Sequence, residues 1–126
     1  MIAALVSRFA RARQGGAAVE YAIVLPAFIV LLVGAFGAAN LGFAINSLHY
    51  AVEDGARCAA VKTTICTDGP STVTYAQSRY SGPQISPTFA YSASGCGHTV
   101  SATGAYQFML GLTTLNVPLS ASACYP

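Results

Sequence analysis

One carboxylate, at the start of a long uncharged run, is the side chain best placed to do chemistry. After Glu20 no Asp, Glu, Lys or Arg occurs before Glu53. A carboxylate held against a bilayer core costs free energy, so an ionisable residue there indicates function by default. The alternative is that Glu20 lies at the membrane interface and favours the positive end of a helix dipole. Both interpretations place Glu20 at the beginning of an apolar helix.

Four cysteines form a second group with chemical potential, and all of them follow the apolar run: Cys58, Cys66, Cys96 and Cys124. An even number on one side of a membrane span fits disulfides in an oxidising compartment. Of the three possible pairings we favour Cys58–Cys66, which closes a short loop, and Cys96–Cys124, which ties down the tail. Free thiols are the alternative. A zinc site at Cys96 and His98 is disfavoured because no CxxC or HxxxH spacing accompanies it, and we expect no cofactor.

The apolar run is long enough to cross a membrane. It extends from Tyr21 to Ala39, and roughly 20 apolar residues span a bilayer as a helix. Arg8, Arg11 and Arg13 precede it, and an excess of Lys and Arg marks the cytoplasmic side. We therefore expect a single-pass protein with a cytoplasmic N-terminus and the remainder of the chain on the outer side.

Composition excludes several classes of function. The chain is 54% hydrophobic and 8% charged, whereas soluble domains carry about 25% charged residues. Half of the six basic residues lie in the first 13 positions, so no basic patch remains outside for nucleic acid. The sequence has no paired carboxylates and no nucleophile–base spacing. A membrane enzyme acting on a small-molecule substrate is therefore the least favoured interpretation.

One helix is expected to continue beyond the membrane. Apolar residues recur every three or four positions as far as Ala59, which predicts a helix from about Ala17 to about Lys62. Its length would be on the order of 70 Å, more than twice the hydrocarbon thickness. Pro26 predicts a kink. The outer half of this helix therefore presents an apolar face that needs a cover.

The C-terminal residues are predicted to supply this cover. Ser71 could cap a short helix that ends near Tyr80. Patterns of β-branched and aromatic residues predict strands at Ile85–Ser92, Thr99–Phe108 and Asn116–Ala123, with an apolar loop from Met109 to Thr114. Three strands need packing against a helix for stability. The expected fold class is α+β, with a leader at 1–15, the long helix at 16–62 and a small disulfide-stabilised antiparallel sheet within 63–126.

The N-terminal half resembles a known family of precursors. The Gly15–Gly16 bond separates the basic leader from the apolar helix, Glu20 is fifth from Gly16, and Tyr21 follows. This arrangement resembles the processing site of type IV pilin-like precursors, and most closely those of the Tad (tight adherence) group. The run RQGGAAVEYAIVLPAFIVLLVG is similar to the start of TadE-like pseudopilins. The segment AVEDGARCAA, at 51–60, is similar to the family's Ala-rich amphipathic segment.

The resemblance implies a minor pilin that contributes to assembly of a Tad pilus and to surface adhesion. It implies that a prepilin peptidase, a membrane aspartyl protease, cuts between Gly15 and Gly16. The partners it implies are other pilin or pseudopilin subunits and the pilus assembly platform. Glu20 of one subunit would then pair with the new amine of Gly16 on a neighbour. The implied location is the bacterial inner membrane, with the C-terminal region periplasmic, or the extracellular pilus.

Two further patterns leave alternatives open. Gly34, Ala38 and Gly42 make a smooth stripe for close helix contact, although Gly and Ala are common in membrane helices in any case. The small residues Gly37, Ala38 and Ala39 can also be interpreted as the cleavage site of an ordinary signal peptide, which would make the chain a secreted disulfide protein beginning at Asn40. The length of the apolar run and the unbroken amphipathic helix disfavour this second interpretation.

Overall fold

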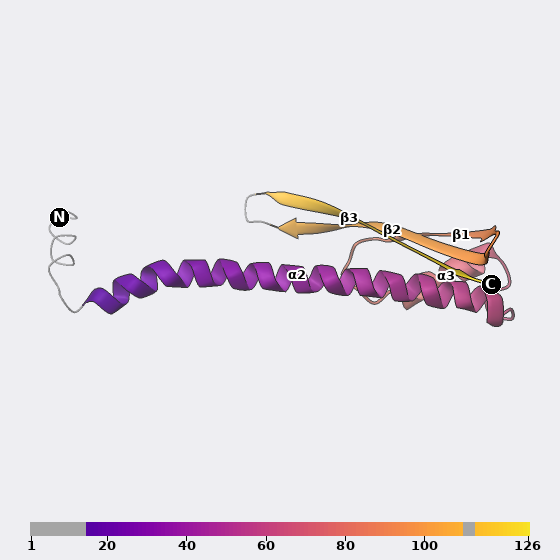
Figure 1. The fold of residues 1–126 in the computed structure, drawn as a ribbon, viewed down its shortest axis with the longest axis horizontal. Helices are drawn as coiled ribbons and strands as arrows, with labels where there is room; N and C mark the ends of the chain where they lie inside the picture. The colour runs from indigo at the N-terminus through magenta and orange to yellow at the C-terminus, as the bar shows by residue number, and fades with distance from the viewer. Residues whose placement is uncertain (1–14, 110–112) are drawn as a thin grey trace. The chain divides into compact units, whose positions relative to one another are not determined.

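The computed structural model describes residues 15–109 and 113–126 (Figure 1). Most of the predicted leader, including its three arginines, and the middle of the predicted apolar loop lie outside the described residues. The described chain contains two helices and three strands, in the order α2, α3, β1, β2, β3. The described residues divide into two compact units, one up to Phe36 and one from Gly37 onwards, and the boundary falls inside α2.

Helix α2, Gly16–Val61, is 46 residues long. Its bounds agree with the predicted helix to within one residue at each end. Pro26 lies inside the helix, in the apolar segment where such a residue is tolerated. Beyond Val61 the amide of Lys62 still donates to the carbonyl of Cys58 at 2.8 Å, and the amide of Cys66 then donates to the Lys62 carbonyl at 3.0 Å. The chain therefore turns sharply where α2 ends.

The first unit is the apolar part of α2. A window of this helix has a mean hydropathy of 2.5, and none of its residues is buried within the chain. Large apolar side chains such as Ile23, Val30 and Phe36 are 71%, 72% and 70% exposed. Helix α2 is thus long and apolar enough for a single membrane pass.

The second unit forms one hydrophobic core around the C-terminal half of α2. The buried residues of that helix recur at helical spacing: Ala44, Leu48, Ala51, Val52 and Ala56. They cluster with buried residues of the sheet, Phe89, Val100, Ala102, Leu119 and Ala121, with Ala76 of α3, and with Ile85. The predicted cover for the apolar helix face is confirmed.

Helix α3, Gly69–Arg79, begins three residues earlier than a helix capped by Ser71 would. The prediction that Ser71 is the cap was wrong, because Asp68 is the N-cap residue. Asp68 Oδ1 accepts from the amide of Ser71 at 2.9 Å, and Ser71 Oγ accepts from the amide of Asp68 at 3.0 Å. Ser71 is therefore the other half of a capping box. Its hydrogen bonds also lower the pKa of the Asp68 carboxyl.

The sheet is antiparallel with strand order β1–β2–β3. Its strands are β1, Thr88–Ser94, β2, Gly97–Met109, and β3, Thr114–Tyr125. The prediction that the first strand begins at Ile85 was wrong by three residues. Ser86 has a positive φ of 46°, and Pro87 has no amide hydrogen for the ladder, so pairing starts at Thr88.

Two disulfides close this unit. Cys58 pairs with Cys66, eight residues apart, and Cys96 pairs with Cys124, 28 residues apart. This is the pairing favoured from the sequence. The first disulfide is buried, and the second is exposed at the β1–β2 turn. Beside the second, Gly97 has φ +129°, and a side chain there would overlap the carbonyl oxygen of Tyr125. Only glycine suits that position.

Candidate functional site

The residues of the predicted processing motif lie at the very start of α2. Gly16 is the first residue of the helix, and Gly15 comes immediately before it. No other part of the described chain approaches within 4 Å of the position of a Cβ on either glycine. Glu20 and Tyr21 follow in the second turn of the helix, and both are exposed. The bond between the two glycines therefore lies where helical structure begins and is not covered by the described fold.

The predicted small-residue stripe is open along its whole length. Gly34 and Ala38 are exposed, and Gly42 is partly so. A Cβ added at Gly34 or Gly42 would meet nothing within 4 Å. A second helix could approach this face closely, because small residues allow backbones to come together.

Gly55 is the point at which three elements meet. A Cβ built on this α2 residue would lie 2.9 Å from the Ala76 Cβ of α3, and 3.6 Å from both Val100 Cγ atoms of β2. Gly55, Ala76 and Val100 are all buried. The Asp-Gly-Ala-Arg segment that resembles the pilin family therefore supplies the glycine that lets α3 and the sheet pack onto α2.

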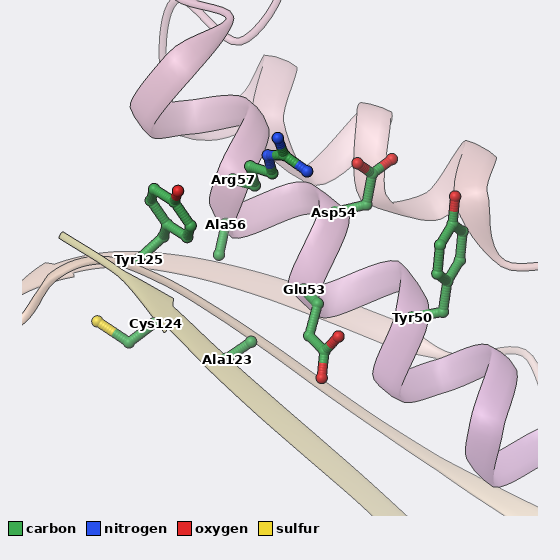
Figure 2. A pocket seen from close by; sticks show the side chains of 8 residues that line it. All are labelled: Tyr50, Glu53, Asp54, Ala56, Arg57, Ala123, Cys124 and Tyr125. Carbon is green, nitrogen blue, oxygen red and sulfur yellow. The ribbon is translucent and has the colours of Figure 1, made fainter.

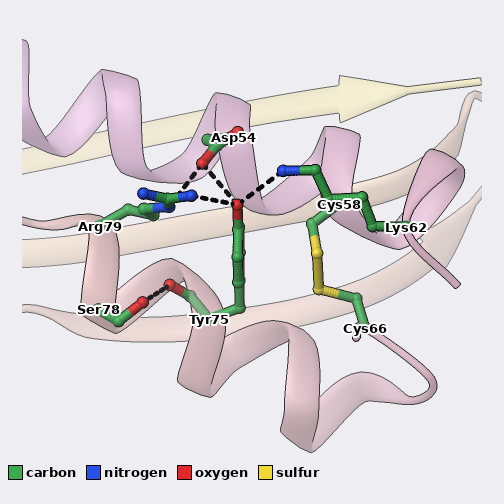
Figure 3. Close-up of polar contacts among 7 residues, drawn as sticks. All are labelled: Asp54, Cys58, Lys62, Cys66, Tyr75, Ser78 and Arg79. Carbon is green, nitrogen blue, oxygen red and sulfur yellow. Dashed lines mark hydrogen bonds and ion pairs between the residues drawn. A yellow bond between two sulfur atoms is a disulfide. The ribbon is translucent and has the colours of Figure 1, made fainter. Parts of the chain in front are cut away.

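A polar cluster, formed by Asp54, Lys62, Tyr75 and Arg79, ties α2 to α3 (Figure 3). The Tyr75 hydroxyl donates to Asp54 Oδ2 at 3.0 Å. It accepts from Arg79 Nη2 at 2.7 Å and from Lys62 Nζ at 3.1 Å. Arg79 Nε also forms an ion pair with Asp54 Oδ2 at 2.9 Å. One tyrosine oxygen therefore joins a carboxylate to two cations.

The electrostatics of this polar cluster favour the charged form of Arg79. Chiefly the Tyr75 hydrogen bond, and to a lesser extent the Asp54 carboxylate, raise the pKa of Arg79 above its usual value. The Arg79 guanidinium also lies 4.9 Å from the centroid of the Tyr75 ring, and Lys62 Nζ lies 5.4 Å from it, within the range of cation–π attraction. The Arg79 side chain is 42% exposed and Asp54 18%, so the cluster is a partly solvated clamp between helices rather than a buried catalytic group.

A recess of about 360 Å³ lies between α2 and the end of β3 (Figure 2). Its lining residues come from both elements: Tyr50, Glu53, Asp54, Ala56, Arg57, Ala123, Cys124 and Tyr125. Glu53 and Arg57 are exposed to water, which screens their charges. The recess is therefore a surface feature lined in part by exposed charged side chains.

Cys96 and His98, the residues of the disfavoured zinc alternative, make other contacts in the structure. Cys96 is bonded to Cys124 and has no thiolate to offer. His98 Nδ1 is 2.7 Å from the Tyr91 hydroxyl, and the two rings stack with centroids 6.0 Å apart. Within residues 15–109 and 113–126, no group of three or more His, Cys, Asp or Glu could hold a metal ion.

Sequence reasoning missed the polar cluster, although part of its signal was present. Tyr75 and Arg79 are four residues apart on a predicted helix, and side chains at that spacing are neighbours on a helix surface. Their partner Asp54 lies 21 residues before Tyr75. Only the packing of α3 on α2 at Gly55 brings the three side chains together.

The comparison with protein families supports the resemblance of the N-terminal half. Residues 15–57 match the family model described as TadE-like protein. The match begins at Gly15 and ends at Arg57, and so covers most of α2, including Glu20 and Gly55. No match to the chain was found among curated proteins or among solved structures.

Proposed function

We propose that this chain, whose residues 15–57 are TadE-like, is a minor pilin of a Tad-type pilus with a structural rather than an enzymatic role. One observation carries the proposal. The family match begins at the predicted cleavage site and runs through the apolar helix to the glycine on which the outer unit packs. It therefore includes both the segment that would be processed and the segment that would hold the subunit in an assembly.

Processing is the first step of the proposed function. A prepilin peptidase would cut between Gly15 and Gly16 on the cytoplasmic side of the membrane. The absence of a Cβ on both residues lets the backbone enter a protease cleft, and nothing in the described fold lies against either position. Cleavage removes the basic leader and leaves a new amine at the first residue of α2.

The Glu20 carboxylate then has a partner on a neighbouring subunit. In a bundle of apolar helices, a charged carboxylate and a charged amine are both costly to desolvate, and each is stabilised by the other. Glu20 lies about one helical turn after Gly16, so its carboxylate is displaced along the axis from the amine of its own chain. Pairing with the Gly16 amine of the next subunit would set an axial stagger between the two helices.

Lateral packing of α2 provides the rest of the association. The helix exposes large apolar side chains through its first half, which either lipid or sibling helices can cover. The stripe of Gly34, Ala38 and Gly42 offers the face on which two helix backbones can come closest. In the membrane, the disulfide-closed unit would lie in the periplasm, and in a pilus it would be displayed outside, where it can contribute to adhesion.

The test uses Glu20 variants in cells that assemble the pilus. Glu20→Ala and Glu20→Gln are expected to insert in the membrane and to lose the first 15 residues, but not to crosslink to other pilin subunits. Glu53→Ala, which removes an exposed carboxylate from the same helix, is the matched control and is expected to assemble. Wild-type crosslinking of Glu20→Gln would refute the charge pairing.

N-terminal sequencing of the mature protein tests the class itself. A start at Gly16 is expected. A start at Asn40 would instead support the secreted disulfide protein, and retention of residues 1–15 would overturn processing. The fold favours the first outcome because α2 is continuous through residues 37–40, so cleavage at Asn40 would divide a helix whose next turn, from Ala44, belongs to the core.

A further inference from the structure

The hairpin formed by β2 and β3 extends well past the rest of the sheet. Strand β1 pairs with β2 only as far as Thr88↔Thr103. The ladder between β2 and β3 continues to Met109↔Thr114. Six residues of β2 beyond Thr103 are therefore paired on one side only, and at about 3.3 Å per residue they carry the hairpin roughly 20 Å further.

The end of this hairpin is apolar and exposed. Met109 is 73% exposed and Leu115 is 55% exposed. Phe108 pairs with Leu115 across the ladder, so the two side chains point to the same face of the sheet. Tyr106 packs edge-to-face against Phe108, with ring centroids 5.8 Å apart. We define Phe108, Met109 and Leu115 as the hairpin tip.

A contact within the second unit places the hairpin tip at a definite level of α2. The ring of Phe108 lies against Gly37, so closely that a Cβ added to this glycine would overlap the ring. Gly37 belongs to the predicted membrane span, which ends at Ala39. With a rise of 1.5 Å per residue, Gly37 lies only about 3 Å inside the outer end of the span. If α2 spans the membrane as predicted, the hairpin tip therefore lies level with the outer surface of that same bilayer.

Charge is distributed as a membrane contact requires. No Asp, Glu, Lys or Arg occurs from Tyr80 to the C-terminus, a stretch that includes the whole sheet. The charged residues of the outer unit all lie instead on the last turns of α2, on the segment that follows it, and on α3: Glu53, Asp54, Arg57, Lys62, Asp68 and Arg79. Contact of the hairpin tip with lipid would desolvate no charge, which is the main cost of entering a bilayer.

We infer that the hairpin tip is a second membrane contact, with Phe108, Met109 and Leu115 resting in the outer-leaflet interface beside the span. The inference rests on the proposed membrane anchoring of α2 and adds a second attachment point to it. Tyr106 lies just above the tip, and tyrosine favours the headgroup level. Two attachment points, one on the helix and one on the sheet, would fix the rotation of the second unit about the helix axis before the subunit is assembled.

The chain contains no tryptophan, so single-tryptophan variants of the full protein provide clean reporters. Met109→Trp reports on the hairpin tip. Thr103→Trp is the matched control, because Thr103 lies on the same strand and the same exposed face, six residues from the tip. Val30→Trp reports on the span itself, where Val30 is 72% exposed. Each variant is reconstituted in phosphatidylcholine vesicles at a low protein-to-lipid ratio, with lipids brominated either near the headgroup or deep in the acyl chain.

Met109→Trp is expected to emit at shorter wavelength than Thr103→Trp and to lose emission in lipids brominated near the headgroup. Val30→Trp is expected to lose emission in deeply brominated lipids, and Thr103→Trp in neither. Quenching of Val30→Trp without quenching of Met109→Trp would overturn the hairpin contact and leave the anchoring intact. Absence of quenching at Val30→Trp would overturn both. The Met109→Trp measurement is repeated at higher protein-to-lipid ratios. A blue shift that grows with this ratio, with no quenching by bromine, would show that the tip contacts a second copy of the chain. That result would refute the lipid contact.

Discussion

Replacing Gly55 by alanine is expected to destabilise the second unit, residues 37–126, although the same change usually stabilises a helix. In an exposed helix interior, Gly→Ala gains about 1 kcal/mol from helix propensity. At Gly55 the new Cβ would lie 2.9 Å from the Ala76 Cβ. Carbon atoms pack best at about 3.5–4.0 Å, so the overlap is roughly 0.6–1.1 Å. The Ala76 Cβ is fixed to the backbone of α3, and the helix must shift to relieve the overlap.

The magnitude follows from the two opposing effects. Overpacking of a close-packed core by one methyl group costs about 1–3 kcal/mol. Subtracting the propensity gain of about 1 kcal/mol leaves a net loss of roughly 0–2 kcal/mol for Gly55→Ala. Gly42→Ala is the matched control in the same helix, because a Cβ there meets nothing within 4 Å. The control should show the propensity gain alone, so the two variants should differ by about 1–3 kcal/mol.

The assay is urea unfolding in detergent, followed by near-ultraviolet circular dichroism of the seven tyrosines, all but one of which follow residue 49. A second variant tests the contact itself. Ala76→Gly removes the nearest atom, so Gly55→Ala should cost less in the Ala76→Gly background than in the wild type. The reasoning is refuted if Gly55→Ala stabilises the protein as much as Gly42→Ala, or if the two mutations are additive.

Two further outcomes are expected. Asp54→Ala should lower the free energy of unfolding by about 1–2 kcal/mol, because it removes the acceptor of the Tyr75 hydroxyl and the ion partner of Arg79; the neighbouring Glu53→Ala should change it little in the same urea titration. Hydrogen bonds from Ser71 lower the folded-state pKa of Asp68, so its stabilisation is complete above the unfolded value of about 3.9 and is lost as pH falls through the folded value. Melting temperatures between pH 2 and 6 should therefore fall less steeply for Asp68→Asn than for the wild type, and parallel curves would contradict this.

The long helix was predictable because its signals are local and repeated. Apolar residues recur at helical spacing from the span into the core, and each turn adds independent support. The three strands were predictable in number and order, but their ends were less so. The start of β1 depends on the positive φ of Ser86 and on Pro87, and the length of the β2–β3 ladder depends on cross-strand pairing. The start of β1 and the length of the ladder therefore depend on neighbouring residues and on the paired strand, and not only on the strand propensity of the residues themselves.

The cap of α3 shows a different limit. Asp68 and Ser71 are both good N-cap residues, and the pattern Asp-x-x-Ser allows either to begin the helix. The choice of Asp68 brings the first turn forward, over Gly69 and Pro70, and proline suits the first positions of a helix. The sequence contained this information in the position of Pro70.

The features of the candidate site also divide into those set by local spacing and those set by long-range packing. The glycine pair, Glu20 and the stripe lie on one continuous helix, so sequence spacing alone places them correctly relative to each other. The polar cluster and the hairpin tip depend on long-range packing, on Tyr75 reaching Asp54 and on Phe108 reaching Gly37. Local sequence patterns could not predict these contacts, because the residues of a strand or helix do not indicate which distant residues they will contact.

The two disulfides make the stability of the second unit depend on the redox state of its compartment. By the chain-entropy relation, closing loops of 8 and 28 residues contributes about 2.5 and about 3.6 kcal/mol. A three-stranded sheet and one short helix make a small core, for which such cross-links are a large share of the usual stability of 5–15 kcal/mol. Disulfides persist in oxidising compartments and not in the cytosol. The second unit therefore reaches its full stability only in an oxidising compartment, which under the topology proposed above is the far side of the membrane.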